Sequence, residues 1–384
     1  MITFHKLSSR VGPETVDRSM IGTTRTYNDK LKTIDFTRLP SHGQKDPTKE
    51  QKESLIFRIH PEREGKQLIF QIGTSDPERA VAASRIVAAD VAGIDVNAGC
   101  PKPFSTSGGM GAALLQTPDK LCAILEALVK EIVPEFEIGI SVKIRLLETP
   151  EKTRALVEKL VATGITGLTI HCRTTPMRPR EKAIREQLKM IADICREAGV
   201  ACLMNGDVDT RAQAEQLMPE FGVDGAMMAR AAEANSSVFR PEAEGGVAPW
   251  KEVVEEYLKI SMDVENRWGN TKFLLGHLVP GKLPVYQQVT QTKSYQQICK
   301  LFGFDHLDSK AIETDEALNI VPLPEGQKQG KGRGKKNKSA LAAGGNHGQA
   351  RAVEGEKRKG LSDRGSTGSE QQAVEAQPLV ALQV

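Results

Sequence analysis

The sequence predicts an α/β fold, namely a (β/α)₈ TIM barrel followed by a small helical domain. Between Leu68 and Arg230, short apolar runs alternate with helix-length segments, which is typical of repeated βα units in a parallel sheet. The runs end in glycine or polar residues, as in barrels that build an active site at the carboxyl ends of their strands. A doubly wound sheet alternates similarly and stays open as the alternative, although no G-x-G-x-x-G fingerprint follows any run.

The predicted barrel strands can be read in chain order. They are LIFQIG (68–73), GIDVNAG (93–99), ISVKIRL (140–146), GLTIHCR (167–173), ACLMNG (201–206) and GAMMAR (225–230). Ahead of them, ESLIFRI (53–59) and QLIF (67–70) flank the polar stretch HPEREGK. Two β-rich runs around a polar turn predict a hairpin beside the first of these strands.

The rest of the chain divides by composition. Residues 1–244 form the predicted barrel domain, and 245–320 have helical spacing without strand signals, which predicts a helical domain. Residues 321–384 are rich in Gly, Lys, Gln, Ser and Glu and contain no aromatic residue, so we expect a disordered tail. Its basic cluster KQGKGRGKKNK (328–338) suits loose RNA binding or nuclear import.

Bulk properties narrow the class of protein. Lys and Arg total 52 against 49 Asp and Glu, a net charge of +3, so any binding of nucleic acid depends on local patches. The six cysteines form no C-x-x-C pair, which argues against a zinc site or a disulfide framework. We expect no metal, no membrane span and a monomer. A cytoplasmic or nuclear location is expected; the basic start MITFHKLSSR keeps a mitochondrial location as the alternative.

The segment DVNAGCPKPFSTSGGMGAALL, from Asp95 to Leu115, carries the most specific signal. It places an asparagine and Cys100 at a strand end, followed by a proline and a glycine-rich turn. A thiol on such a loop can serve as a general acid, because it is mostly protonated at neutral pH. A small buried cysteine beside a turn proline explains the spacing equally well.

The run N-A-G-C-P-K followed by S-G-G-M-G-A-A-L-L resembles the signature of dihydrouridine synthases, in particular the eukaryotic subtype acting on uridine 20 of the tRNA D-loop. The resemblance extends from about Gly12 to Asp308 and includes QIGTSDPERA, VKIRL, TIHCRTTPMRPRE, MNGDV, MARAA and NTKFLL. It implies an FMN-dependent reduction of uridine to dihydrouridine, with NADPH as hydride donor. In that family the cysteine matching Cys100 protonates C5 of the uracil, while reduced FMN delivers hydride to C6.

The resemblance also implies roles for other residues. Those expected to bind the cofactor are Gln71, Lys143 and His171 at the flavin ring, and Asn205, Gly206, Asp207, Ala229 and Arg230 at its phosphate, where barrels often bind one. Asn97 is expected to contact the target uracil. Arg173 and Arg178, with Arg180 in the same loop, are expected to hold the RNA backbone, although such charge runs are usually solvated faces.

Members of the family begin with a strand, a helix and a second strand ahead of the region matched here by GPETVDRSMIG. The eleven residues MITFHKLSSRV cannot supply all three. We therefore expect a barrel that lacks its first strand and holds FMN weakly. Two alternatives stay open: a catalytically impaired tRNA-binding protein, and another FMN barrel acting on a free pyrimidine, as in dihydroorotate dehydrogenase.

Overall fold

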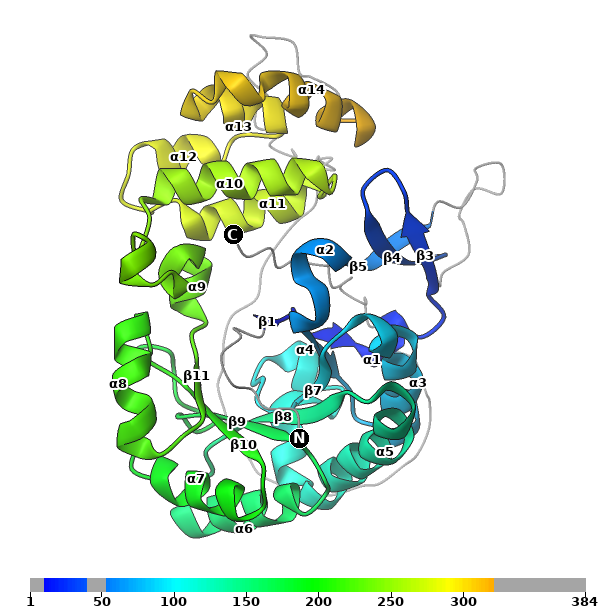
Figure 1. Cartoon of the computed structure of the whole chain (residues 1–384), viewed down its shortest axis with the longest axis vertical. Helices are drawn as coiled ribbons and strands as arrows, with labels where there is room; N and C mark the ends of the chain where they lie inside the picture. The colour runs from blue at the N-terminus through cyan, green and yellow to red at the C-terminus, as the bar shows by residue number, and fades with distance from the viewer. Residues whose placement is uncertain (1–9, 40–52, 321–384) are drawn as a thin grey trace, which may run out of the picture. The chain divides into compact units, whose positions relative to one another are not determined.

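The computed structural model describes residues 10–39 and 53–320, and its centre is a curled, wholly parallel sheet (Figure 1). Its strands are β1 (Arg10–Val11), β2 (Thr15–Val16), β6 (Leu68–Gly73), β7 (Gly93–Asn97), β8 (Gly139–Arg145), β9 (Gly167–His171), β10 (Ala201–Asn205) and β11 (Gly225–Met227). The order across the sheet is β1-β6-β7-β8-β9-β10-β11, and β2 also pairs with β6. The six predicted runs are β6 to β11, and the predicted order is confirmed.

The first strand position is interrupted. Arg10 is the register partner of Leu68, and Thr15 is the partner of Ile72, so β1 and β2 follow one another along the same side of β6. Pro13 separates them, and a proline has no N–H to donate to a ladder. Because β1 and β2 share one position, the eight strands described fill seven positions of an open barrel.

Helices follow most strands of this sheet. Those of the barrel region are α1 (Asp17–Met20), α2 (Pro61–Glu64), α3 (Pro77–Val87), α4 (Pro103–Thr106), α5 (Pro118–Phe136), α6 (Pro150–Val161), α7 (Leu188–Glu197), α8 (Arg211–Phe221) and α9 (Arg230–Ala234). Helices α3, α6 and α8 each begin after a residue whose side chain accepts a hydrogen bond from the backbone N–H three positions later, namely Asp76, Thr149 and Thr210. Such caps satisfy amides that otherwise lack a partner in the first turn.

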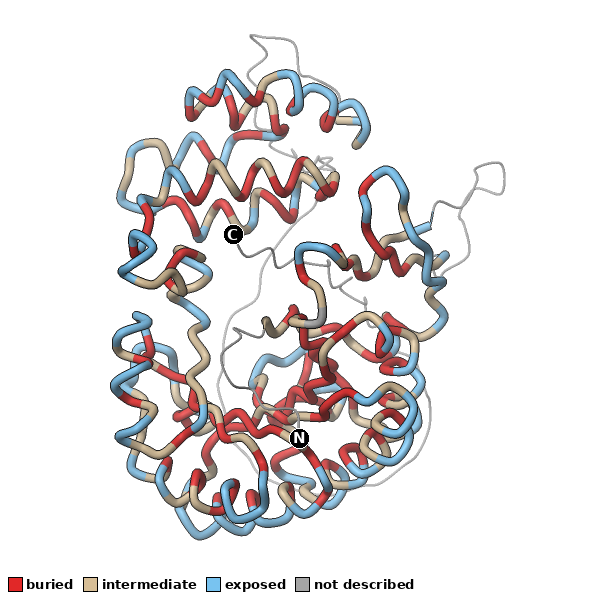
Figure 2. Tube along the Cα trace, in the orientation of Figure 1, coloured by how far each residue is buried: buried red, intermediate tan, exposed pale blue. Residues whose placement is uncertain are grey.

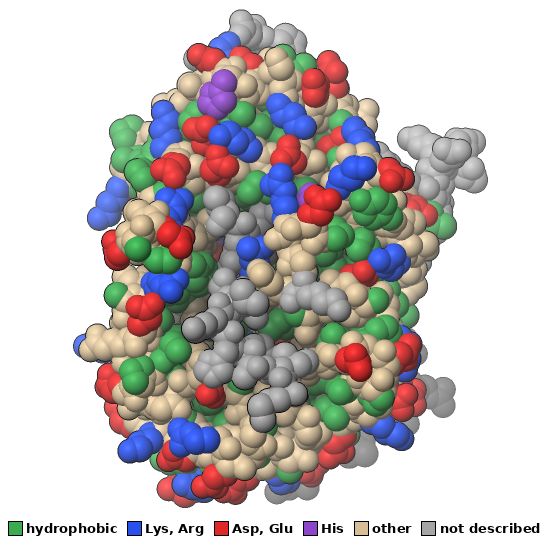
Figure 3. All heavy atoms as spheres, in the orientation of Figure 1, with side chains coloured by type: hydrophobic (Ala, Val, Ile, Leu, Met, Phe, Trp, Pro, Cys, Tyr) green, Lys and Arg blue, Asp and Glu red, His purple; other side chains and the backbone are tan. Residues whose placement is uncertain are grey.

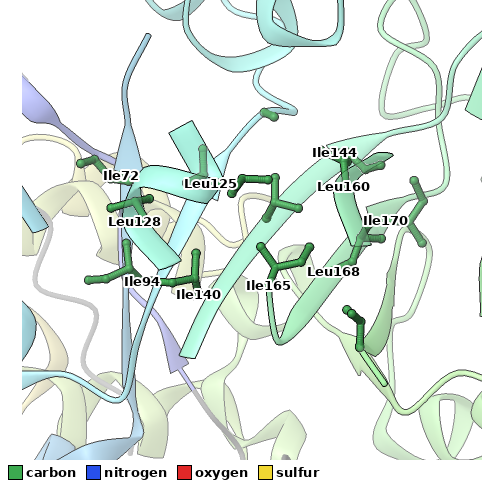
Figure 4. Packing of buried hydrophobic residues seen from close by; sticks show 14 of the residues in the cluster. Ile72, Ile94, Leu125, Leu128, Ile140, Ile144, Leu160, Ile165, Leu168 and Ile170 are labelled. Atoms are coloured by element: carbon green, nitrogen blue, oxygen red, sulfur yellow. The ribbon is translucent and has the colours of Figure 1, made fainter. Parts of the chain in front are cut away.

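The core lies between the sheet and the helices that cover it. Ile94 of β7 and Ile140 of β8 are register partners, and both are fully buried, as are Leu125 and Leu128 of α5 (Figure 4). Figure 2 shows buried residues along the strands and exposed residues on the outward sides of the helices. Burying each such side chain contributes about 1.5–3 kcal/mol, and the rigid sheet that results fixes the positions of its strand ends.

The predicted hairpin is wrong. A separate antiparallel sheet contains β3 (Thr24–Asn28), β4 (Thr33–Arg38) and β5 (Ser54–Ile59), and β5 pairs with β4 rather than with β6. Both edges of β6 are already paired, with β1 and β2 on one side and β7 on the other. The stretch HPEREGK contains helix α2 instead, because Pro61 at its first position and the acidic residues after it favour a helix N-terminus.

Residues 245–320, all of which the structure describes, contain helices and no strand. The α-helices of this region are α10 (Trp250–Asp263), α11 (Trp268–Leu278), α12 (Val285–Val289), α13 (Tyr295–Phe302) and α14 (Asp308–Ala317). They pack around a hydrophobic cluster of their own, in which the rings of Trp268 and Tyr295 meet edge to face with centroids 5.3 Å apart. The tail predicted over 321–384 lies outside the described residues.

Candidate active site at the carboxyl ends of the strands

The parallel register brings the predicted site residues to one edge of the sheet. The register partners there are Gln71 with Asp95, Asn97 with Lys143, Arg145 with His171, His171 with Asn205, and Asn205 with Met227. Because strands in a parallel sheet all end at the same edge, polar residues at their ends converge. Five of the predicted positions thereby become neighbours across β6 to β10, although 134 residues separate the first from the last in the sequence, from 71 to 205.

The loop after β7 presents Cys100 at this edge. The Asn97 side-chain oxygen accepts hydrogen bonds from the backbone N–H groups of Gly99 (3.0 Å) and Cys100 (3.1 Å), and the Cys100 carbonyl accepts from Ala112 N (2.9 Å). Gly111 has φ +56°, and a Cβ there would lie 2.6 Å from the Cys100 carbonyl oxygen, so this turn requires glycine. The Cys100 side chain is partly exposed. The loop therefore offers a thiol on a fixed backbone.

Arg145, which was not predicted as a site residue, holds the same loop from β8. Its side chain is buried, its Nε donates to the Gly99 carbonyl at 2.6 Å, and its Nη1 donates to the Thr174 carbonyl at 3.2 Å. Arg145 thus joins the Cys100 loop to the loop after β9. The sequence held a signal for it, because Lys143 and Arg145 are two positions apart in a strand and so face the same way.

A buried carboxylate, also missed from the sequence, lies beneath the site. Asp95 accepts hydrogen bonds from Gln71 Nε2 at 2.8 Å and from the Ser141 hydroxyl at 2.7 Å. Burial raises the pKa of Asp95, and burial lowers the pKa of Lys143, whose charge Asp95 partly supports. The sequence signal that could have identified Asp95 is an acidic residue inside the otherwise mostly apolar strand GIDVN. Asp95 fixes the Gln71 amide, and its interaction with Lys143 opposes the effect of burial on the pKa of Lys143.

His171 is neutral at physiological pH. Burial, followed by the charges of Lys143, Arg145 and Arg173, lowers the pKa of His171 to about 3. Its Nε2 lies 3.3 Å from Nη1 of Arg173. A guanidinium only donates, so Nε2 accepts this hydrogen bond and the ring proton lies on Nδ1. The site therefore contains an uncharged imidazole among three cations.

A cavity of about 200 Å³ opens beside these residues at the ends of β8 to β11. It is lined by Arg145, His171, Arg173, Met177, Pro179, Asn205, Gly206, Asp207, Val208, Asp209, Met227, Ala229 and Arg230. Gly206 has φ +122°, and a Cβ on it would lie 3.3–3.4 Å from Ala183, Arg173 and His171. All five residues predicted at the cofactor phosphate line this cavity.

The polar groups of the cavity are linked by Asp207. Its Oδ1 accepts from Nη2 of Arg173 and, at 2.7 Å, from Nη2 of Arg230, while Asn205 Nδ2 donates to the Met227 carbonyl at 2.9 Å. Burial acts to raise the pKa of Asp207, but the hydrogen bond from Arg173 and its neighbours outweighs burial, so the net shift is downward. Arg230 at the start of α9 has a side chain that is 56% exposed. Two guanidinium groups thus meet one carboxylate.

The arginines of the loop after β9 differ in exposure. Arg173 is 3% exposed, and its donors contact the carbonyls of Glu181 (2.7 Å) and Pro179 (3.3 Å) as well as Asp207. These internal contacts do not fit the expected grip on an RNA backbone, and Arg173 instead holds the loop together. Arg178 and Arg180 are exposed, so they alone in this set fit a surface contact.

Comparison with known proteins gives the family of this chain. Residues 14–298 match the dihydrouridine synthase (Dus) family. The chain is 45% identical over 326 residues to the tRNA-dihydrouridine(20) synthase (NAD(P)+) of Schizosaccharomyces pombe, covering 82% of this chain and 65% of that protein. It is 41% identical over 293 residues to the Saccharomyces cerevisiae protein of the same name, covering 74% of each.

A human tRNA-dihydrouridine(20a/20b) synthase (NAD(P)+)-like protein is more distant, at 31% identity over 175 residues, 45% of this chain and 53% of that one. The chain spans less than two thirds of the length of the fission yeast relative. Its similarity is greater to relatives named for position 20 than to the one named for positions 20a and 20b. The match to the family covers β2 to β11 and most of the helical region, and the chain belongs to the dihydrouridine synthase family.

Proposed function

We propose that this protein reduces a uridine in the tRNA D-loop, at position 20, to dihydrouridine, using FMN and NADPH. The observation that carries the proposal is the Cys100 loop, which holds a partly exposed thiol at the carboxyl-end edge of the sheet in a chain similar over most of its length to position-20 synthases. The reaction adds a hydride at C6 and a proton at C5 of the uracil, and NADPH is oxidised to NADP+.

The residues present fit FMN. Gly206 leaves space that a side chain would fill, and Arg230 is exposed enough to meet a phosphate in the cavity. Lys143 offers a cation and His171 a neutral donor for the carbonyl and nitrogen edge of a flavin ring. When bound there, FMN would supply the hydride. Arginines and backbone groups near a glycine are suited to a phosphate at this end of a barrel.

The protein itself would supply the proton that is added at C5 of the uracil. Cys100 would donate it from Sγ to C5, and water would later restore the thiol proton. General-acid catalysis requires the donor to be held within hydrogen-bond reach of its target. Asn97 and Arg145 provide that restraint, through the two backbone N–H groups and the Gly99 carbonyl respectively.

An asparagine side chain can both donate and accept hydrogen bonds, but we expect Asn97 to act toward the uracil only as a donor. Its Oδ1 already accepts two backbone hydrogen bonds, whereas Nδ2 makes a long contact of 3.5 Å with Gln71 Oε1 and also interacts with the Glu14 carboxyl. The amino group is therefore the part that can meet a base. We expect it to donate to a uracil carbonyl oxygen, because a flipped base is read through its polar edge.

The tRNA would be bound by local charge rather than by a strong overall field. Charged side chains of both signs are interspersed over the face seen in Figure 3, as the net charge of +3 suggests. Exposed Arg178 and Arg180 are the best candidates in the barrel for phosphate contacts. Binding should therefore weaken steeply with salt.

The test is to map dihydrouridine after incubating the full chain with FMN, NADPH and a tRNA transcript. We expect reduction at uridine 20 and none in a matched transcript carrying cytidine there. Reduction of free uridine or orotate at a comparable rate would support the free-pyrimidine alternative. Binding of tRNA without any reduction, in protein shown to contain FMN, would support the non-catalytic one.

A further inference from the structure

We infer that Arg185 is a positioning residue that couples occupancy of the cavity to the tRNA-facing arginine loop. The inference rests on the proposed function. The arginine loop comprises residues 172–187, between β9 and α7, and the phosphate loop comprises residues 205–207, which begin at the last residue of β10. The pairing of β9 with β10 ends at Asn205, so backbone pairing between strands does not join the rest of the two loops. Side chains and single amides connect them instead.

Arg185 makes the central connection. Its Nη2 donates to the carbonyls of both Gly206 (3.1 Å) and Asp207 (2.7 Å). These two residues have φ +122° and +50°, the region in which an L side chain such as that of Asp207 is unfavourable. A backbone held in that region depends on the surrounding contacts, and here one guanidinium NH₂ group binds both carbonyls.

Further hydrogen bonds from the arginine loop reach the side chain of Asp207. Asp207 Oδ2 accepts from the backbone N–H of Ala183 at 2.8 Å, and its Oδ1 accepts from Arg173, which also binds the Glu181 and Pro179 carbonyls. The arginine loop is thus anchored to the phosphate loop at several points along its length. Exposed Arg178 lies between these anchors.

The consequence is a linkage between two ligands. A phosphate contacting Gly206 and Arg230 would restrict the phosphate loop, and the shared hydrogen bonds would restrict the arginine loop with it. The entropy cost of ordering Arg178 and Arg180 would then be met before tRNA binds, which increases tRNA affinity. By reciprocity, tRNA would increase FMN affinity by the same factor.

The experiment measures tRNA affinity of the full chain with and without saturating FMN at one fixed salt concentration. For the wild type we expect FMN to tighten tRNA binding about fivefold or more, and in Arg185→Met we expect less than about twofold. Lys182→Met is the matched control. It removes the same charge from an exposed position in the same loop, without a described bond to residues 205–207, and should keep the wild-type coupling.

Hydrogen exchange supplies a second readout that a merely structural role would not change. FMN should slow exchange of the Ala183 amide, the donor to Asp207, in the wild type and in Lys182→Met but not in Arg185→Met. If Arg185→Met does not fold, Arg185→Lys keeps the charge but cannot reproduce the guanidinium geometry, and it should lose most of the coupling.

The outcomes separate the two proposals. Equal tRNA affinity with and without FMN in the wild type, or unchanged coupling in both Arg185 variants, would overturn the linkage while leaving the proposed reaction intact. Failure of the wild type to bind FMN at all would overturn the proposed function and the linkage together.

Discussion

Arg173 donates from Nη2 to Oδ1 of Asp207, and this pair ties the loop after β9 to the loop after β10. The Arg173 side chain is 4% exposed and that of Asp207 is 27% exposed. Without Arg173, Asp207 keeps its contacts with Arg230 and the Ala183 amide, but the Glu181 and Pro179 carbonyls lose their donor and Asp207 loses its most buried partner. Arg173→Ala should therefore lower the free energy of unfolding by roughly 3 kcal/mol in urea titrations. A change below about 0.5 kcal/mol would show that the pair is unimportant for stability.

Arg178→Ala should affect tRNA binding rather than stability, because Arg178 is exposed. We expect unchanged stability and a shallower salt dependence of tRNA binding, by about one counterion for each phosphate that the arginine neutralises. Arg178→Lys is the control and should keep the wild-type slope, since it retains the charge. A slope unaltered by the alanine substitution would assign Arg178 to the solvated surface.

Cys100→Ala should slow uridine reduction by roughly 10²–10⁴-fold in single-turnover assays, the usual effect of losing a general acid. Reduction of bound FMN by NADPH should continue at the wild-type rate, because the thiol acts only on the uracil. Wild-type single-turnover rates on tRNA in the variant would exclude Cys100 as the acid.

His171 predicts a stability that depends on pH. The pKa of His171 is lowered to about 3 in the folded protein, chiefly by burial, against about 6.5 in an unfolded chain. Between these values the unfolded chain binds a proton that the folded protein does not. Stability is thus fully present above about pH 6.5 and is lost as the pH falls toward 3.

The check is to subtract the unfolding curves of His171→Asn from those of the wild type at each pH. The difference should be constant above pH 6.5 and should shift against the wild type on acidification, because asparagine does not titrate. A difference that stays constant from about pH 7 to pH 4 would mean that His171 titrates normally when folded.

The sequence allowed the main sheet to be predicted because each barrel strand carries its own signal. LIFQIG and GIDVN are short, mostly apolar runs with β-branched residues, and they are found as β6 and β7. The role of the segment before β6 could not be predicted in this way. An antiparallel partner for Phe57 lies in β4, about twenty residues earlier, and local patterning contains no information on which of two strands a third will pair with.

The positions of the candidate site residues at strand ends were predictable from the sequence, but their surroundings were not. Gln71, Asn97 and Lys143 were placed at strand ends, where the structure has them. Arg173 and Arg178 look equivalent in sequence, yet one is buried against Asp207 and the other is exposed. That difference depends on the loop after β10, which only the folded chain brings near.

An anaerobic half-reaction tests the proposed reduction of uridine 20 most sharply. FMN-loaded protein is first reduced with one equivalent of NADPH and then mixed with a tRNA transcript, while flavin absorbance is followed and the RNA is analysed. We expect the uridine-20 transcript to reoxidise the flavin with one dihydrouridine formed per flavin, and the cytidine-20 transcript to cause no reoxidation. Reduced flavin that persists with the uridine-20 transcript, in protein that binds both FMN and tRNA, would contradict the proposed reaction.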